Sequence, residues 1–130
     1  MTVEEREALK KEFFSCLHCA IPGIVDSFDP ETQTVNVQPA VKGFPLLRDV
    51  PVFFPGTRSS AITWMVQSGD ECLVIFADSA IDRWFETGEA DTPPSDRSHD
   101  LSDAFAFVGF RSKPNALQSF PDEPSFFGRS

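Results

Sequence analysis

The chain has no tyrosine, two histidines and three cysteines among its 130 residues. Three cysteines cannot all pair within one chain, so the sequence does not indicate a disulfide scaffold, and folding in a reducing cytoplasm is the simplest expectation. No apolar run approaches the length of a membrane span, and the charged N-terminus, with Glu4, Glu5 and Arg6, does not resemble a secretory signal. We therefore expect no stable insertion into a membrane.

Basic charge is also scarce, with 11 basic against 20 acidic residues and a formal net charge of -9. A net acidic surface repels phosphate backbones, so the composition argues against nucleic acid as a partner. Many of the carboxylates lie between Asp78 and Asp103. We interpret this stretch as a solvated loop and face, or alternatively as a surface for a basic partner.

Phenylalanine is present in excess, with 14 copies. Its ring carries no polar group, so it suits dry packing better than hydrogen-bonded recognition. Several of these rings lie near the chain ends, and a monomer of this size would not bury them all, so we expect an oligomer or a partner surface. The residues expected at this interface are Phe13, Phe14, Leu17, Trp84, Phe85, Phe126 and Phe127.

Six short apolar stretches separated by turn residues predict strands. They are Gly23–Phe28, Thr34–Val41, Leu47–Phe54, Ala61–Val66, Glu71–Ala77 and Asp103–Phe110. Their number and length predict a mainly β fold, a small antiparallel OB-type Greek-key barrel. The run Cys72–Phe76 does not alternate, which predicts the most buried strand, and Pro51 predicts an edge or interrupted strand.

The two ends of the chain differ from this pattern. Thr2 and Glu5 have the spacing of a capping box, which predicts an N-terminal α-helix within residues 1–20 that stops before Pro22. The barrel is then expected over residues 21–110, with a short helical or turn segment at Ser79–Thr87. Residues 111–130 contain three prolines and no clear period, so we expect an extended C-terminal tail.

Two clusters of reactive side chains are candidates for a metal site and for a hydrolytic site. Cys16, His18 and Cys19 have ligand types that suit zinc, but a closed zinc site needs four ligands and the sequence has no second pair. His99 and Asp100 with Ser102 and Asp103 lack the motif of a nucleophile elbow, and we interpret that stretch as loop capping by Asp100, Ser102 and Asp103. We therefore expect no metal, no cofactor, no catalytic residues and no enzymatic activity.

Aromatic residues outside the strands offer a different possibility. Trp64, Trp84 and Phe85 have the side chains of a stacking platform for bases or sugars, such as OB barrels present. Platforms for nucleic acid come with a basic groove, whereas this sequence is acidic around them. Core packing or a subunit interface is the use that we favour for these three rings.

Five segments, in the same order, resemble the N-terminal domains of the central baseplate spike proteins of contractile-tailed phages. They are Ile21–Ala40, Asp49–Gly56, Gln67–Asp78, Ile81–Phe85 and His99–Ala106. The resemblance implies an OB-like barrel that forms trimers, sits under the tail-tube hub and leads into a triple-stranded β-helical needle. The sequence shows no β-helical repeat and no H-x-H motif, so the needle is either missing from this piece or supplied by another protein.

Together the residues and the resemblance predict a non-enzymatic homotrimeric adaptor between tail hub and needle, assembled in the host cytoplasm and located in the virion tail baseplate. One alternative is a free-standing OB-fold binding module for oligosaccharide or single-stranded nucleic acid. A second is a metal-dependent enzyme that uses Cys16, His18 and Cys19.

Overall fold

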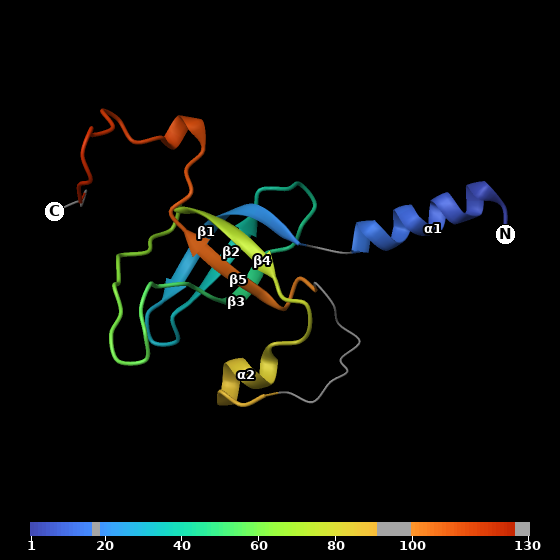
Figure 1. Cartoon of the computed structure of the whole chain (residues 1–130), viewed down its shortest axis with the longest axis horizontal. Helices are drawn as coiled ribbons and strands as arrows, with labels where there is room; N and C mark the ends of the chain where they lie inside the picture. The colour runs from blue at the N-terminus through green and yellow to red at the C-terminus, as the bar shows by residue number, and fades with distance from the viewer. Residues whose placement is uncertain (17–18, 91–99, 127–130) are drawn as a thin grey trace.

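The computed structural model describes residues 1–16, 19–90 and 100–126. It contains five strands: β1 (Ala20–Asp29), β2 (Thr34–Pro39), β3 (Leu47–Pro51), β4 (Glu71–Phe76) and β5 (Ala104–Val108). The helical elements are α1 (Val3–Cys16), α2 (Asp82–Thr87) and a single 3₁₀ turn, η1 (Lys113–Asn115). Figure 1 shows the strands wrapped together, with α1 and the C-terminal segment projecting from them.

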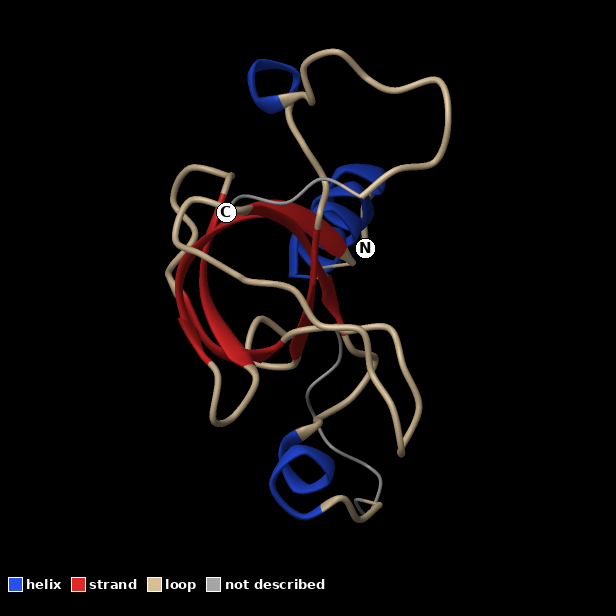
Figure 2. Cartoon of the chain, turned by 90° about the vertical axis from the view of Figure 1, so that its left-hand side faces the viewer, coloured by secondary structure: helices blue, strands red, loops and turns tan. Residues whose placement is uncertain are grey.

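The strands form one antiparallel sheet in the order β3-β2-β1-β4-β5. The sheet curls until its two ends meet, as Figure 2 shows. There Val52, just past β3, forms a parallel bridge with Ala106 of β5, and the Phe53 amide donates to the Ala106 carbonyl at 3.0 Å. The predicted mainly β, OB-like fold is therefore confirmed.

The core inside this curl is built chiefly from small aliphatic residues. Its members are Val25, Val35, Val37, Leu47, Val50, Val52, Val66, Cys72, Val74, Phe76, Ala104 and Ala106. Among the phenylalanines that the structure describes, Phe76 alone belongs to this cluster, and Phe28 and Phe54 pack against it partly buried. Valine suits the pleated surface of strands, and the excess of phenylalanine lies outside the core.

One predicted strand, Ala61–Val66, is wrong. The segment is extended, but its pairing is limited to an isolated bridge between Gly56 and Ala61. The side chains of Ile62 and Met65 are exposed, whereas Val66 reaches the core. A strand needs a neighbour for its backbone groups, and both sides of β4, which follows this segment, are already taken by β1 and β5.

The prediction that Cys72–Phe76 is the most buried strand is also wrong. Burial alternates along β4: Cys72, Val74 and Phe76 point into the core, while Leu73 and Ile75 point out. Ile75 remains 37% exposed. The apolar run therefore means that both faces of β4 are apolar, and only one of them is covered by the chain itself.

The predicted helix start and edge strand are confirmed. The Glu5 amide donates to Thr2 Oγ1 at 3.1 Å, and the Thr2 amide donates to Glu5 Oε2 at 3.2 Å, which is the reciprocal capping box. Pro51 is the last residue of β3, at an end of the sheet order, where its missing N–H is tolerated. No helix in the described residues is long and apolar enough to cross a membrane.

Candidate interaction surface

The outer side of the sheet carries an apolar surface over parts of β1, β4 and β5. Leu73 in β4 lies between its cross-strand partners Pro22 and Phe107. Two residues along, Ile75 lies between Ala20 and Phe105. Directly opposed residues point to the same face of a sheet, so these side chains form a contiguous patch. We call the six residues Ala20, Pro22, Leu73, Ile75, Phe105 and Phe107 the outer apolar face.

Two further rings extend this face at its margin. The Trp84 ring lies 5.7 Å from the ring of Phe105, and the Phe53 ring lies 5.1 Å from that of Phe107, measured between centroids. Trp84 and Phe53 are each 49% exposed. The patch of exposed apolar area is thus wider than the strands alone provide.

A buried carboxylate places Trp84 beside the face. Asp103 is fully buried, its Oδ1 accepts the Ile81 amide at 3.1 Å, and its carbonyl accepts the Ala77 amide at 2.7 Å. These bonds join both ends of the long connection between β4 and β5. Helix α2 starts directly after Ile81 and ends at Thr87, and the next residue, Gly88, has a φ of 75° that suits glycine.

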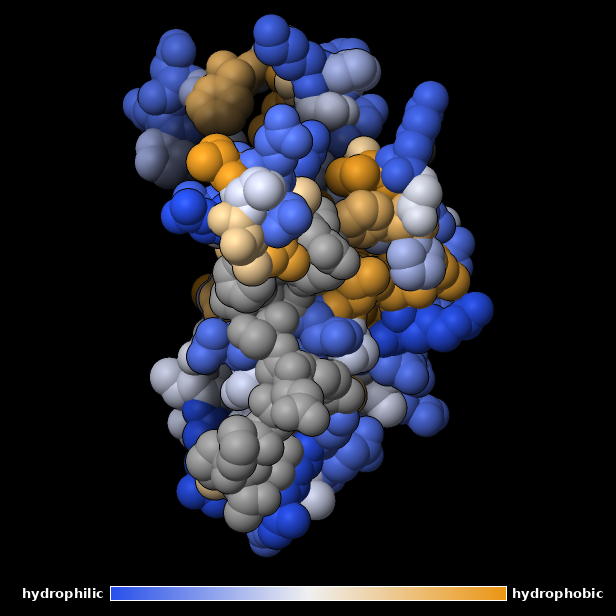
Figure 3. Space-filling view, turned by 90° about the vertical axis from the view of Figure 1, so that its right-hand side faces the viewer, coloured by the Kyte–Doolittle hydropathy of each residue, from blue (hydrophilic) through white to orange (hydrophobic). Residues whose placement is uncertain are grey.

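Figure 3 shows the side of the molecule from which α1 projects. Hydrophobic side chains gather across the middle and right of this view. The lower part of the view is mostly hydrophilic where it is coloured. Large exposed hydrophobic residues also lie outside the strands, among them Val3 in α1 and Phe120 and Phe126 in the C-terminal segment.

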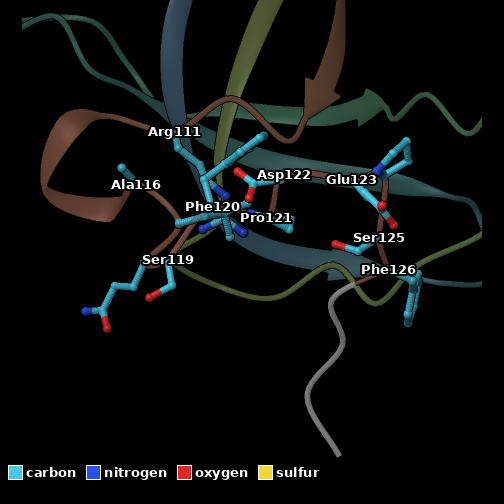
Figure 4. Close-up of a pocket in the computed structure, with 12 residues that line it drawn as sticks. Arg111, Ala116, Ser119, Phe120, Pro121, Asp122, Glu123, Ser125 and Phe126 are labelled. Carbon is cyan, nitrogen blue, oxygen red and sulfur yellow. The ribbon is translucent and has the colours of Figure 1, made fainter.

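A hollow lies within the C-terminal segment, as Figure 4 shows. It has a volume of about 860 Å³ and is lined by Arg111 and residues 116–126. Phe120 and Phe126 on its rim are 78% and 94% exposed. All of its lining comes from one extended stretch of chain, so it lacks the rigid wall of a preformed ligand site.

A comparison with known protein families decides the broad identity of this barrel. The profile of the phage protein Gp138 N-terminal domain matches residues 21–109. The chain belongs to this family. No curated protein matches it. The Gp138 N-terminal domain begins inside β1 and ends just after β5, so it contains nearly the whole barrel and every residue of the outer apolar face except Ala20.

The family agrees with the resemblance drawn from the five sequence segments, and it indicates a structural protein of a phage particle. Helix α1 and the C-terminal segment from Phe110 onward lie outside the matched Gp138 region. The family match therefore assigns no role to these two segments.

The predicted interface residues meet the outer apolar face at one point. Trp84 contacts it directly, and Phe85 lies half-buried with its ring 6.5 Å from that of Trp84. Phe126 is exposed in the C-terminal segment. Of the other four predicted residues, Leu17 and Phe127 lie outside the described residues, and Phe13 and Phe14 belong to the part of α1 whose side chains are not described.

Sequence reasoning missed the strand residues of this face. The signal was present in two places: the apolar run that contains Leu73 and Ile75, and the alternation of Phe105 and Phe107 with alanines in β5. Small residues on the core side with large rings on the other side indicate that the larger apolar area faces outward.

The proposed stacking platform is not assembled as one surface by ring contacts. Trp64 packs on Phe54 with centroids 5.8 Å apart, whereas Trp84 packs on Phe85 and Phe105. No ring pair within residues 1–16, 19–90 and 100–126 joins the two tryptophans.

The two cysteines whose side chains the structure describes differ in exposure. Cys19 is exposed with a free thiol, and Cys72 is buried in the core. Burial, with a smaller contribution from Asp70, raises the pKa of the Cys72 thiol to about 11. Cys16 ends α1, and His18 lies outside the described residues. In the described part of the chain, no three His, Cys, Asp or Glu side chains gather as they would around a metal.

The segment before β5 behaves as a loop cap. The Ser102 amide and hydroxyl both donate to Asp100 Oδ1, at 2.9 Å and 2.7 Å. The predicted capping role of Asp100 and Ser102 is therefore confirmed. His99 lies outside the described residues.

Proposed function

We propose that this chain is a non-enzymatic structural component of the baseplate of a contractile phage tail. In this role three copies of the barrel form an adaptor that links the tail-tube hub to a needle that pierces the cell envelope. The family places the barrel among phage proteins, and the observation that carries the proposal further is the outer apolar face.

The partner of this face is taken to be another copy of the same chain. Exposed apolar patches that are wide and rigid are typical of interaction sites, because covering them removes apolar area from water. Each copy carries a net charge of -9, so two copies repel unless they meet through a region without charge. The six residues of the outer apolar face provide such a region.

A trimer is the assembly that suits this surface and the resemblance. The resemblance implies three copies, and a ring of three is held by head-to-tail contacts, in which the outer apolar face and its aromatic margin on one copy meet a different surface of the neighbouring copy. The rings of Phe53 and Trp84 then lose their exposed area at the contacts between neighbours. The proposal needs no catalytic chemistry from the barrel.

The two projecting segments serve as connections in this proposal. The residues of α1 from Val3 to Lys11 are exposed, and Figure 1 shows the helix directed away from the barrel, which leaves it free to contact the hub or a neighbouring copy. Residues 111–126 lead away from the end of β5 toward the needle. The alternative of an OB-fold binding module gains no support from the separate positions of Trp64 and Trp84.

The location in the particle is tested by immunogold electron microscopy of purified phage with antibodies raised against residues 21–109. We expect gold at the distal end of the tail, because the adaptor sits beneath the hub. An antibody against the major capsid protein serves as the control for head labelling. Label on the head, or absence of the chain from particles by mass spectrometry, would contradict the proposal.

A further inference from the structure

The C-terminal segment leaves β5 and returns at once to β4, where it meets one carboxylate oxygen. The backbone amide and the hydroxyl of Ser112 each donate to Glu71 Oε1 at 2.9 Å. The side-chain amide of Asn115 donates to the same oxygen, also at 2.9 Å. Hydrogen bonds to an ionised acceptor are about twice as strong as neutral ones, and three of them meet on this one exposed oxygen.

Neighbouring bonds complete the arrangement. Arg111 Nη1 donates to the Asn115 carbonyl at 3.1 Å, which closes the turn at η1, and Asn115 Nδ2 also donates to Ser112 Oγ at 3.3 Å. The Gly109 amide donates to the Glu71 carbonyl at 3.3 Å. We call the contacts of Glu71 with Ser112 and Asn115 the Glu71 clasp.

The clasp depends on the carboxylate being ionised. The Ser112 amide, then the Asn115 and Ser112 side chains, lower the pKa of the Glu71 carboxyl, and the Arg111 charge adds to this effect. Asp70 precedes Glu71 in the chain, and Lys113 lies in η1. The residues next to Glu71 on the adjacent strands, Ile24 of β1 and Gly109 after β5, are uncharged.

Without this contact, the segment would have little to hold it. Strand β5 ends at Val108, and Gly109 has a φ of 123°, a conformation that glycine adopts without steric strain and that turns the chain out of the strand. Phe110 is 58% exposed and no residue of η1 is buried. Ladder pairing of β4 uses backbone groups, so the side chain of Glu71 is not required to form the strand.

We propose that Glu71 is a positioning residue that fixes the start of the C-terminal segment on β4. The residues after Asn115 then leave the barrel from a set point, beside the outer apolar face. The consequence that three such segments leave a trimer at symmetric points rests on the proposed function. The clasp itself does not, since all of its bonds lie within one copy.

The sequence supplies a specific probe of the clasp. Trypsin cleaves after Arg111 only if the Arg111–Ser112 bond enters the protease, which requires the Ser112 amide to leave Glu71. The next basic residue, Lys113, precedes Pro114 and is resistant to trypsin. Mass spectrometry of early digests therefore reports opening at one bond, and cleavage after Arg48 in β3 reports the integrity of the barrel.

We expect Glu71→Ala to raise the initial rate of cleavage after Arg111 about tenfold, the factor that corresponds to losing charge-assisted bonds. Glu71→Gln keeps a neutral acceptor and should raise the rate less. Glu31→Ala, which removes an exposed carboxylate from the β1–β2 turn, is the matched control and should leave the rate unchanged.

An unchanged rate in Glu71→Ala with an intact barrel would overturn the proposal. If Glu71→Ala also becomes cleavable after Arg48, the barrel itself has been disturbed, and Asn115→Ala then tests the clasp. This variant removes a clasp bond from the side of the segment and leaves β4 unchanged. A faster cut after Arg111 in Asn115→Ala supports the clasp, and an unchanged one contradicts it. Light scattering on the same samples reports the oligomeric state, so failure of the clasp and failure of the trimer are distinguished.

Discussion

Single residues of this chain differ sharply in reactivity because of where the barrel places them. Cys72 points into the core, and its thiol pKa is raised to about 11, so its thiolate is scarce at pH 8 and becomes abundant only as the pH approaches that value. Cys19 is exposed. The thiolate is the nucleophile in alkylation, so reaction rate follows its abundance and its access.

We expect N-ethylmaleimide at pH 8 to label Cys19 readily and Cys72 at least about a hundredfold more slowly, given the raised pKa and the burial. Peptide mapping by mass spectrometry separates the two sites. In urea both thiols should react at similar rates, which is the control. Equal labelling of the two in the folded protein would show that Cys72 is not enclosed.

Residue-scale contacts were predictable where they are local in sequence. The capping box of Thr2 and Glu5 spans three positions, and within the β1–β2 turn the Asp29 carboxylate accepts the Glu31 amide, two positions on, at 3.0 Å. The Glu71 clasp joins residues 41 and 44 positions apart. The spacing of these residues in the sequence does not predict the clasp, because the contact forms only when β4 and β5 pair in the folded sheet.

At the scale of elements, strand β1 is the central strand of the sheet, between β2 and β4. Gly23 in this strand is buried, and a methyl group added there would lie 2.5 Å from Val37 Cγ1 and 3.6 Å from Cys72 Sγ. The absence of a side chain at this position therefore allows β1 to lie close against the core.

Gly23→Ala should lower the free energy of unfolding by about 1–3 kcal/mol, the usual cost of overpacking a filled core. Urea denaturation followed by circular dichroism measures it. Asp26→Ala, an exposed change in the same strand, should alter stability by less than about 0.5 kcal/mol. A Gly23→Ala protein as stable as the parent would mean that the core has room the structure does not show.

Elements were predicted well where local pattern and pairing agree. Composition and turn residues indicated five of the strands, but Ala61–Val66 has strand-like residues and no free neighbour in the sheet. The non-alternating run in β4 predicts burial on both sides, but only one of its faces is buried. Sequence reports that both faces are apolar; it does not report whether the second face is covered by the same chain or by another.

At the scale of the whole molecule, two properties oppose each other. The net charge of -9 keeps copies of the chain apart in water. The outer apolar face, with Trp84 and Phe53 at its margin, favours their association. Salt screens repulsion between exposed charges over about 10 Å at 0.1 M, so association should strengthen as ionic strength rises.

The central claim is that copies of the barrel assemble in threes through the outer apolar face, and sedimentation velocity at high protein concentration tests it most directly. The account predicts a species near three times the 14.4 kDa chain mass. Leu73→Glu with Ile75→Glu should yield a folded monomer, while Ile62→Glu, a change at an exposed residue that is not part of the outer apolar face, should remain a trimer. A parent protein that stays at 14.4 kDa throughout would contradict the account.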